Sequence, residues 1–268
     1  MDDFALKRRQ LLDLVGVAAL SQLVGCAADA VAAEPQALTQ DPLEQHIALL
    51  VYPEMTLLDL VGPQTCFSAL GMTMHLVWKT LEPITTESGI VILPTTTFEQ
   101  CPSDLEILFI PGSTFGVTPL MRDQQVLDFV RSRGERAKLV TSVCTGSLVL
   151  GAAGLLRGYR ATSHWFTREV LPEAEAIRVD ARYVEDRNRI TGAGVTSGID
   201  FGLRILDRLS GREIAEMTQL LMEYAPEPPF NAGEPSTAPP LAVDTIRTLF
   251  GLALIDGRLA MQEAAAKF

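Results

Sequence analysis

A cysteine at position 144 stands between two sequence patterns. The apolar run 137–143 is typical of a buried strand, and residues 148–156 form an apolar helical pattern. The short turn 144–147 (CTGS) joins them. A cysteine at such a sharp turn lies beside free backbone N–H groups and the positive end of the helix dipole, which favour the thiolate. This position predicts that Cys144 is a nucleophile, whereas the residue type alone indicates only a small buried side chain.

Two other segments contain groups that could assist a nucleophile. The apolar run 105–110 ends in Pro111-Gly112-Ser113, and the backbone N–H groups of Gly112 and Ser113 could stabilise charge that develops on a substrate. An ordinary β-turn is the alternative interpretation. Asp59 lies among apolar residues shortly after the first strand, so it is either a turn or capping residue or an acid with a perturbed pKa.

The rest of the chain alternates strand and helix patterns, as expected for the elements that position these groups. Strand-like runs occur at 46–52, 74–80, 105–110 and 137–143, with hairpin arms at 88–94 and around 186–188. Helical patterns occur at 62–70, 119–133, 148–156, 196–209 and 214–224. This alternation predicts an α/β fold with a mostly parallel sheet, and ligands bind such sheets at the carboxyl ends of the strands. Residues 226–240 should be irregular, and 241–268 should form one or two helices.

The composition limits the classes of function. The 268 residues are 47% hydrophobic, which is enough for one buried core, and the net charge is −11. This acidity argues against a nucleic-acid surface, because binding phosphates requires clustered Lys and Arg. The four cysteines and three histidines show no zinc-ligand spacing, so we expect neither a metal nor another cofactor. They are Cys26, Cys66, Cys101, Cys144, His46, His75 and His164.

The first residues resemble an export signal. Residues 7–12 (KRRQLL) contain twin arginines, and the apolar run that follows to Val24 is too short to span a bilayer comfortably. Two processing sites are possible. Residues 23–26 (LVGC) resemble a lipobox, in which Cys26 would be lipidated, and residues 31–33 (VAA) resemble an ordinary signal-peptide cleavage site. We therefore expect an exported protein, periplasmic or anchored through Cys26, or a cytoplasmic one if the signal does not function.

The chain thus divides into four parts. Residues 1–33 are the signal, 34–45 a linker, 46–225 one α/β domain, and 226–268 a Pro-rich segment with a C-terminal helical extension. Two full domains are possible by length, but no second pattern that would fill one is present in the sequence.

Several segments resemble the DJ-1/PfpI superfamily. The resemblance is carried by residues 46–63, 108–112, 140–156 and 161–165. Within the superfamily, residues 198–201 (GIDF) and 223–231 (EYAPEPPFN) resemble the branch that hydrates isonitriles. The resemblance implies a flavodoxin-like three-layer sandwich of the class I glutamine amidotransferase type, usually a homodimer, that works without a cofactor.

The resemblance also implies roles for individual residues. The family's catalytic cysteine falls on Cys144, its neighbouring threonine on Thr145 and its acid on Asp59. Backbone N–H groups of Gly112, Ser113 and Thr145 would line an oxyanion hole. His164 would support the site from behind the cysteine, or be a packed residue. The sequence departs from the family at Ser113 and Ala193, where glycine is usual, so the donor geometry and the shape of the pocket could differ.

The implied reaction is hydration of an isonitrile to an N-substituted formamide through a covalent thioimidate on Cys144. One alternative is another hydrolase or glyoxalase-like enzyme of the superfamily. Those relatives tend to have Glu at the acid position or His after the cysteine, whereas this chain has Asp59 and Thr145. The other alternative is a small-molecule-binding domain without turnover.

Overall fold

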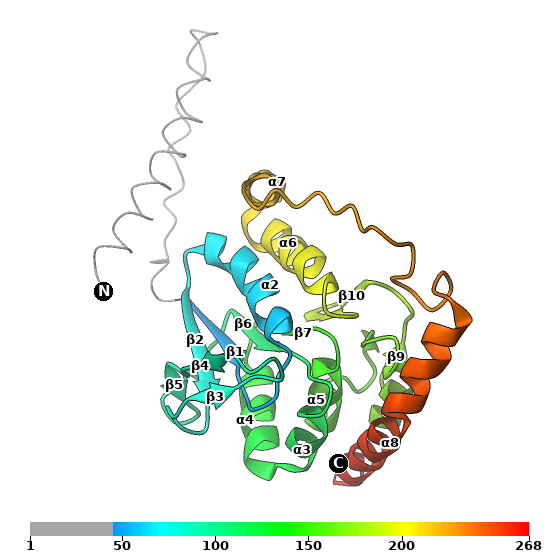
Figure 1. Cartoon of the computed structure of the whole chain (residues 1–268). Coiled ribbons are helices and arrows are strands. Elements are labelled where there is room, and N and C mark those ends of the chain that lie inside the picture. Colours follow the sequence, from blue (N-terminus) through cyan, green and yellow to red (C-terminus); the bar gives the residue numbers. More distant parts are fainter. Residues whose placement is uncertain (1–44, 268) are drawn as a thin grey trace, which may run out of the picture. The chain divides into compact units, whose positions relative to one another are not determined.

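The fold is built on a seven-stranded sheet (Figure 1). The computed structural model describes residues 45–267. The strand order is β10-β11-β7-β6-β1-β2-β5, and all neighbours are parallel except β10 and β11. The strands are β1 (His46–Leu50), β2 (Thr73–Trp78), β5 (Thr96–Thr97), β6 (Ile107–Ile110), β7 (Leu139–Ser142), β10 (Tyr183–Asp186) and β11 (Arg189–Gly192).

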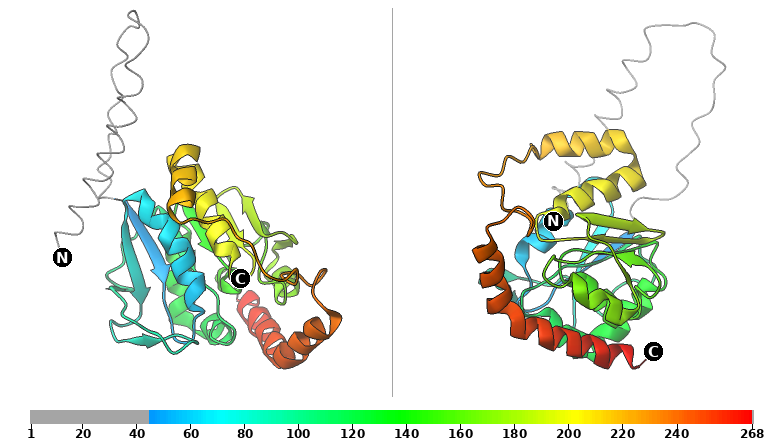
Figure 2. Two further views of the ribbon diagram at one scale, coloured as in Figure 1. Left: turned by 45° about the horizontal axis from the view of Figure 1, so that its top comes forward. Right: turned by 90° about the vertical axis from the view of Figure 1, so that its right-hand side faces the viewer.

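Helices cover both faces of the sheet (Figures 1 and 2). One layer contains α2 (Leu57–Phe67), α6 (Ser197–Ser210) and α7 (Arg212–Leu221). The opposite layer contains α3 (Val117–Arg122), α4 (Gln124–Gly134), α5 (Gly146–Ala152), the 3₁₀ segment η3 (Arg168–Ala174) and α8 (Pro240–Ala265). Short elements complete the fold: η2 (Ser68–Leu70), the antiparallel pair β3 (Ile84–Thr85) and β4 (Val91–Ile92), and the parallel pair β8 (Arg160–Ala161) and β9 (Ile177–Arg178). The predicted three-layer sandwich is confirmed.

The core lies on both faces of the central strands. β6 is buried at all four positions, and β1 is buried at all but its first, as expected for parallel strands covered on both sides. Phe67 of α2, Phe109 of β6 and Phe201 of α6 form an aromatic cluster with ring centroids 5.8 to 6.4 Å apart. This cluster fixes α2 and α6 on the sheet, and thereby fixes the segments that reach the site.

Two helix boundaries differ from the prediction. The helix expected from Gly62 begins at Leu57, so Pro63 lies inside α2, where its ring removes one backbone hydrogen bond. Pro63 packs against α6, because a Cβ at Gly198 would lie only 3.1 Å from its ring. The helix expected over 119–133 is two helices, since Asp123 has an extended backbone and its side chain accepts the Val126 N–H, capping α4.

The C-terminal extension forms a single 26-residue helix, α8. Its second half is anchored, with small side chains and one methionine buried at Gly257, Ala260, Met261 and Ala264. Arg122 of α3 holds it through ion pairs of 2.8 Å with Asp256 and with Glu263. Ile246 and Phe250, in its first half, line the cavity described below.

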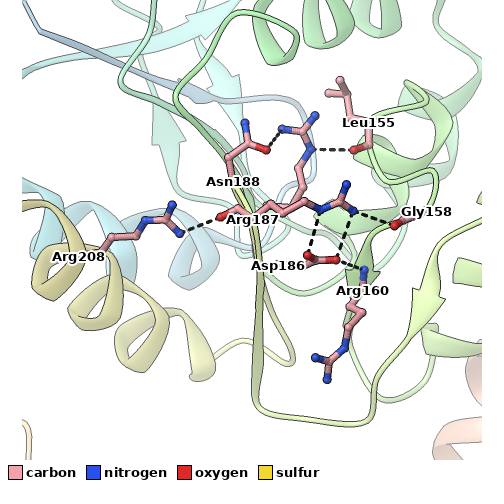
Figure 3. A network of polar contacts seen from close by, with 8 residues as sticks. Leu155, Gly158, Arg160, Asp186, Arg187, Asn188 and Arg208 are labelled. Atoms are coloured by element: carbon pink, nitrogen blue, oxygen red, sulfur yellow. Dashed lines mark hydrogen bonds and ion pairs between the residues drawn. The ribbon is translucent and has the colours of Figure 1, made fainter.

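A network of arginines attaches the β10–β11 hairpin to the turn after α5 (Figure 3). Arg187 donates to the Gly158 carbonyl at 2.8 Å and pairs with Asp186 at 3.1 Å. Arg189 donates to the Leu155 carbonyl at 2.8 Å. These contacts hold β11 beside β7, the strand that leads into the Cys144 turn.

The predictions for the N-terminus fall outside the described residues. These are the signal over 1–33, the lipid anchor at Cys26 and most of the linker over 34–45. The export, the lipidation and the homodimer stay predictions. Among residues 45–267, no helix is long and apolar enough to cross a bilayer.

The close packing at the start of α5 gives a test of the fold. A Cβ on Gly146 would lie 2.2 Å from the Ile110 carbonyl oxygen, whereas a Cβ on Gly251 in α8 would meet nothing within 4 Å. We expect Gly146→Ala to lower the free energy of unfolding by at least about 2 kcal/mol, because backbone must move to admit the methyl group. The matched control Gly251→Ala should raise it by up to about 1 kcal/mol. Urea unfolding measures both, and equal effects would contradict the packing.

Candidate active site

The Cys144 turn has a strained backbone. Cys144 has a φ of 57°, in the left-handed region that non-glycine residues rarely adopt. Its N–H donates to the carbonyls of Gly192 and Ala193, at 3.2 and 2.7 Å. Its own carbonyl accepts the Ser163 hydroxyl at 3.1 Å. The surrounding strand ends thus hold the residue in a conformation that presents its side chain at the carboxyl edge of the sheet.

Asp59 is fully buried beside Cys144. It lies in the first turn of α2, and its Oδ2 accepts the Gly112 N–H at 2.9 Å. Its other oxygen, Oδ1, is buried without a hydrogen-bond partner among the described residues. Since Oδ2 is an acceptor, Oδ1 is the atom that can carry a proton. Sequence analysis placed Asp59 and Cys144 in one site, and the structure brings them together.

The electrostatics couple these two side chains. Burial raises the pKa of Asp59 to about 7, while hydrogen bonds from Gly112 and Cys144 oppose that rise. Burial and the nearby Asp59 charge raise the pKa of the Cys144 thiol well above its usual value, although the Thr145 backbone N–H lowers it. The prediction of a thiolate at rest is therefore wrong for this arrangement, because desolvation outweighs the helix terminus. The resting pair holds one shared proton at pH values above about 7.

Gly112, Ser113 and Thr145 form an interlocked turn. The Ser113 N–H donates to Thr145 Oγ1 at 2.9 Å, and this hydroxyl donates back to the Ser113 carbonyl at 2.7 Å. A Cβ on Gly112 would lie 2.6 Å from the Thr145 nitrogen, so glycine is required there. Two of the three N–H groups predicted for the oxyanion hole, those of Gly112 and Ser113, thus already bond to Asp59 and Thr145.

The two departures from the family pattern are accommodated. Ser113 does not have a positive φ, and its hydroxyl accepts the Gly116 N–H at 2.7 Å, which orders the loop before α3. Ala193 is buried without a positive φ, and its carbonyl accepts the Cys144 N–H. The extra side chains therefore change the surroundings of the site without breaking its backbone.

A cavity of about 300 Å³ opens onto Cys144 and Thr145. Its lining is largely apolar and comes from α3, α5, η3, the loop 164–167 and α8. Glu87 also lines it and accepts the Thr56 hydroxyl at 2.7 Å, which gives the pocket a carboxylate. The volume is at the small end of the range for ligand sites, so the cavity suits a small molecule.

His164 lines the same cavity. Burial, followed by the charge of Arg168, lowers the pKa of His164 to about 4, so the ring is neutral at pH 7. No hydrogen bond links it to Cys144 among the described residues. Its role stays a prediction. Among those same residues, no three His, Cys, Asp or Glu side chains gather closely enough to hold a metal.

Sequence reasoning missed the wall formed by α8. Ile246, Phe250, Leu254 and Gly257 face the cavity, together with Ala253. Their spacing of three and four residues is the signal of one helix face, and it was visible in the sequence. What the sequence could not show is that this face covers the Cys144 turn, about one hundred residues earlier in the chain.

The fold and the site define a class of protein: an open α/β sheet with a cysteine in a left-handed turn at the carboxyl edge, beside a buried acid. The chain belongs to the DJ-1/PfpI family, whose model matches residues 45–208.

Individual relatives extend this match. Isonitrile hydratase of Pseudomonas putida is 51% identical over 203 residues, which cover 75% of this chain and 88% of the relative. Protein DJ-1alpha of Drosophila melanogaster is 29% identical over 149 residues, covering 55% of this chain and 69% of the relative. The crystal structure of a ThiJ/PfpI family protein from Pseudomonas syringae is 45% identical, with a TM-score of 0.76, and the match covers 91% of this chain and 99% of that one.

The raised pKa of Asp59 predicts a pH dependence of stability. Its pKa is about 7 in the folded state against 3.8 for an aspartate in water, so between these pH values the folded state keeps a proton that the unfolded state loses. Stability is therefore fully present below pH 3.8 and is lost as the pH rises through 7, by about 4 kcal/mol. Asp59→Asn removes this titration and should be the more stable form at pH 8.

The measurement is urea unfolding of both proteins at pH 4, 6 and 8. The difference between wild type and variant isolates Asp59 from the other carboxylates. Stability curves that stay parallel across this range would show that Asp59 has an ordinary pKa.

Proposed function

We propose that the chain hydrates isonitriles to N-substituted formamides, with Cys144 as the nucleophile. The observation that carries this proposal is the contact between Cys144, which lines an apolar cavity, and the buried acid Asp59 beside it. The 51% identity to a protein named isonitrile hydratase supports the choice of substrate.

The first step forms a thioimidate. The Cys144 thiol gives its proton to the Asp59 carboxylate, and the sulfur attacks the terminal carbon of R–N≡C. Asp59 then delivers the same proton to that carbon, which gives R–N=CH–S–Cys144. No proton enters or leaves the site, so a pair that holds one proton at rest is sufficient.

The second step releases the product. Water adds to the thioimidate carbon, and Asp59 transfers a water proton to the nitrogen. The carbon–sulfur bond then breaks, the remaining hydroxyl proton returns to sulfur through Asp59, and R–NH–CHO leaves. Thr145 has an unused lone pair on a hydroxyl that Ser113 holds in place, so it can accept a hydrogen bond from the water.

The occupied N–H groups favour this reaction over amide or ester hydrolysis. Acyl transfer develops an oxyanion and requires donors that are free to bind it. Here the N–H groups of Gly112 and Ser113 are committed to Asp59 and Thr145. Addition of a thiol to an isonitrile develops negative charge on carbon instead, and a proton donor such as Asp59 meets that requirement.

The role of the thiol is tested by substitution. Cys144→Ala should lower kcat/KM for cyclohexyl isonitrile by at least about a thousandfold, because the covalent route is lost. Cys101→Ala is the matched control, since Cys101 is also a buried free cysteine but does not line the cavity. Formamide production measured by chromatography reports the rate. A Cys144→Ala protein with full turnover would reject the mechanism, and turnover of 2-oxoaldehydes in place of isonitriles would indicate a glyoxalase-like enzyme.

The shared proton predicts the pH profile. The reactive form has lost one of the two protons of the Asp59–Cys144 pair, and the first is lost near pH 7. We therefore expect kcat/KM to rise about tenfold per pH unit below pH 7 and to level off above it. Steady-state rates between pH 5 and 9 provide the measurement. A rate that falls through pH 7 would mean that the doubly protonated pair is the active form.

A further inference from the structure

We propose that α8 is the specificity element of the site, with Phe250 and Ala253 setting the size of the substituent that the pocket accepts. The identification of the substituent as the R group of an isonitrile rests on the proposed function. The role of α8 as a wall of the cavity rests only on the structure.

The face of α8 that looks into the cavity continues the face that anchors the helix. Gly257, Ala260 and Ala264 are buried against the protein body. One and two turns earlier, Ala253 and Phe250 occupy the same stripe but are only partly buried, because they line a hollow. The helix thus has one apolar face with two uses: residues 246–257 of this face line the free volume, and Ala260 and Ala264 beyond them are packed against the protein body.

Phe250 is held by neighbouring rings. Its centroid lies 5.9 Å from that of Phe115 and 6.1 Å from that of Phe166, the latter with the edge-to-face geometry that aromatic pairs prefer. Trp165 packs against Phe166 in turn, at 5.7 Å. A ring supported on two sides gives the cavity a defined wall, which a mobile side chain would not.

The geometry of the first step directs the substituent toward this wall. An isonitrile is linear, so once its terminal carbon contacts the sulfur, the substituent extends away from Cys144. Asp59 and the Gly112 backbone occupy the floor behind the thiol. The remaining volume is bounded by Leu148, Val195 and α8, which offer apolar contact.

The anchors of α8 make this wall firm. Arg258 pairs with Glu169 at 2.8 Å and with Glu173 at 3.3 Å, and both glutamates belong to η3. Together with the ion pairs of Arg122, they attach the helix to both α3 and η3. The position of the wall formed by residues 246–257 is therefore fixed by ion pairs that α8 makes at residues 256–263.

Two substitutions of opposite direction test the wall. Phe250→Ala enlarges the cavity and should lower the ratio of kcat/KM for cyclohexyl isonitrile over methyl isonitrile about tenfold, because the ring loses its contact. Ala253→Phe fills the cavity and should abolish turnover of the cyclohexyl compound while methyl isonitrile is still hydrated. The matched control is Leu252→Ala, since Leu252 is on the same helix but 83% exposed and outside the cavity lining.

A second readout separates this inference from the proposed function. Mass spectrometry of the peptide that contains Cys144 gives its alkylation rates by iodoacetamide and by N-phenyl iodoacetamide. Phe250→Ala should raise the ratio of the N-phenyl iodoacetamide rate to the iodoacetamide rate at least about threefold, and Ala253→Phe should lower this ratio. Changes of this size are expected when a pocket wall gains or loses a few methylene groups.

The outcomes distinguish the two claims. If methyl isonitrile is hydrated but neither ratio changes in the variants, the role of α8 is overturned and the proposed function stands. If no isonitrile is hydrated but the alkylation ratio shifts as stated, the wall is supported and the proposed function fails. Equal shifts in Leu252→Ala would trace the effect to helix stability and would also overturn the role of Phe250.

Discussion

The site depends on the close approach of three chain segments at the ends of neighbouring strands. The backbone at Gly112 lies so near the Asp59 carboxylate and the Thr145 backbone that no side chain fits between them. This contact fixes the buried acid beside the cysteine. An Asp59 carboxylate in water would have an ordinary pKa, so its burial at this point is what allows it to exchange a proton with Cys144.

Burial and the local hydrogen bonds act on the acid–thiol pair in opposite directions. Desolvation favours the neutral form of both groups, while the Gly112 and Thr145 N–H groups favour the charged forms. The larger effect is desolvation, so above about pH 7 the pair rests as a carboxylate and a thiol that share one proton rather than as an open thiolate. A protected thiol of this kind is less exposed to adventitious oxidation than a free thiolate, because reactivity follows thiolate character.

The sequence was sufficient for the fold and for placing Cys144 at the carboxyl edge of the sheet, with Asp59 beside it. The apolar runs at β1, β6 and β7 have the continuous pattern of doubly covered strands, and the small residues after Cys144 marked the turn. Local sequence patterns did not predict helix boundaries that depend on a tertiary contact or on a capping side chain. Pro63 lies within α2 because α6 packs on it, and Asp123 divides a helical pattern by capping α4.

The protonation of Cys144 and the wall of the pocket could not be predicted locally either. The helix terminus suggested a thiolate, but the degree of burial depends on segments distant in the chain. The spacing of Ile246, Phe250 and Ala253 predicts one face of a helix, but the sequence does not show that this face lines the cavity at Cys144. Both depend on which surfaces meet, and that information is absent from a window of neighbouring residues.

The Pro-rich stretch between α7 and α8 carries the chain from one layer of the sandwich to the opposite one (Figure 2). It thereby delivers a helix from beyond the family-matched residues 45–208 to the Cys144 turn, which lies within them. On the specificity role proposed above for α8, the nucleophile and one wall of its pocket are encoded in separate stretches of the gene. Remodelling of the tail would then change the range of compounds accepted, while the inherited residues at the sheet edge stay the same.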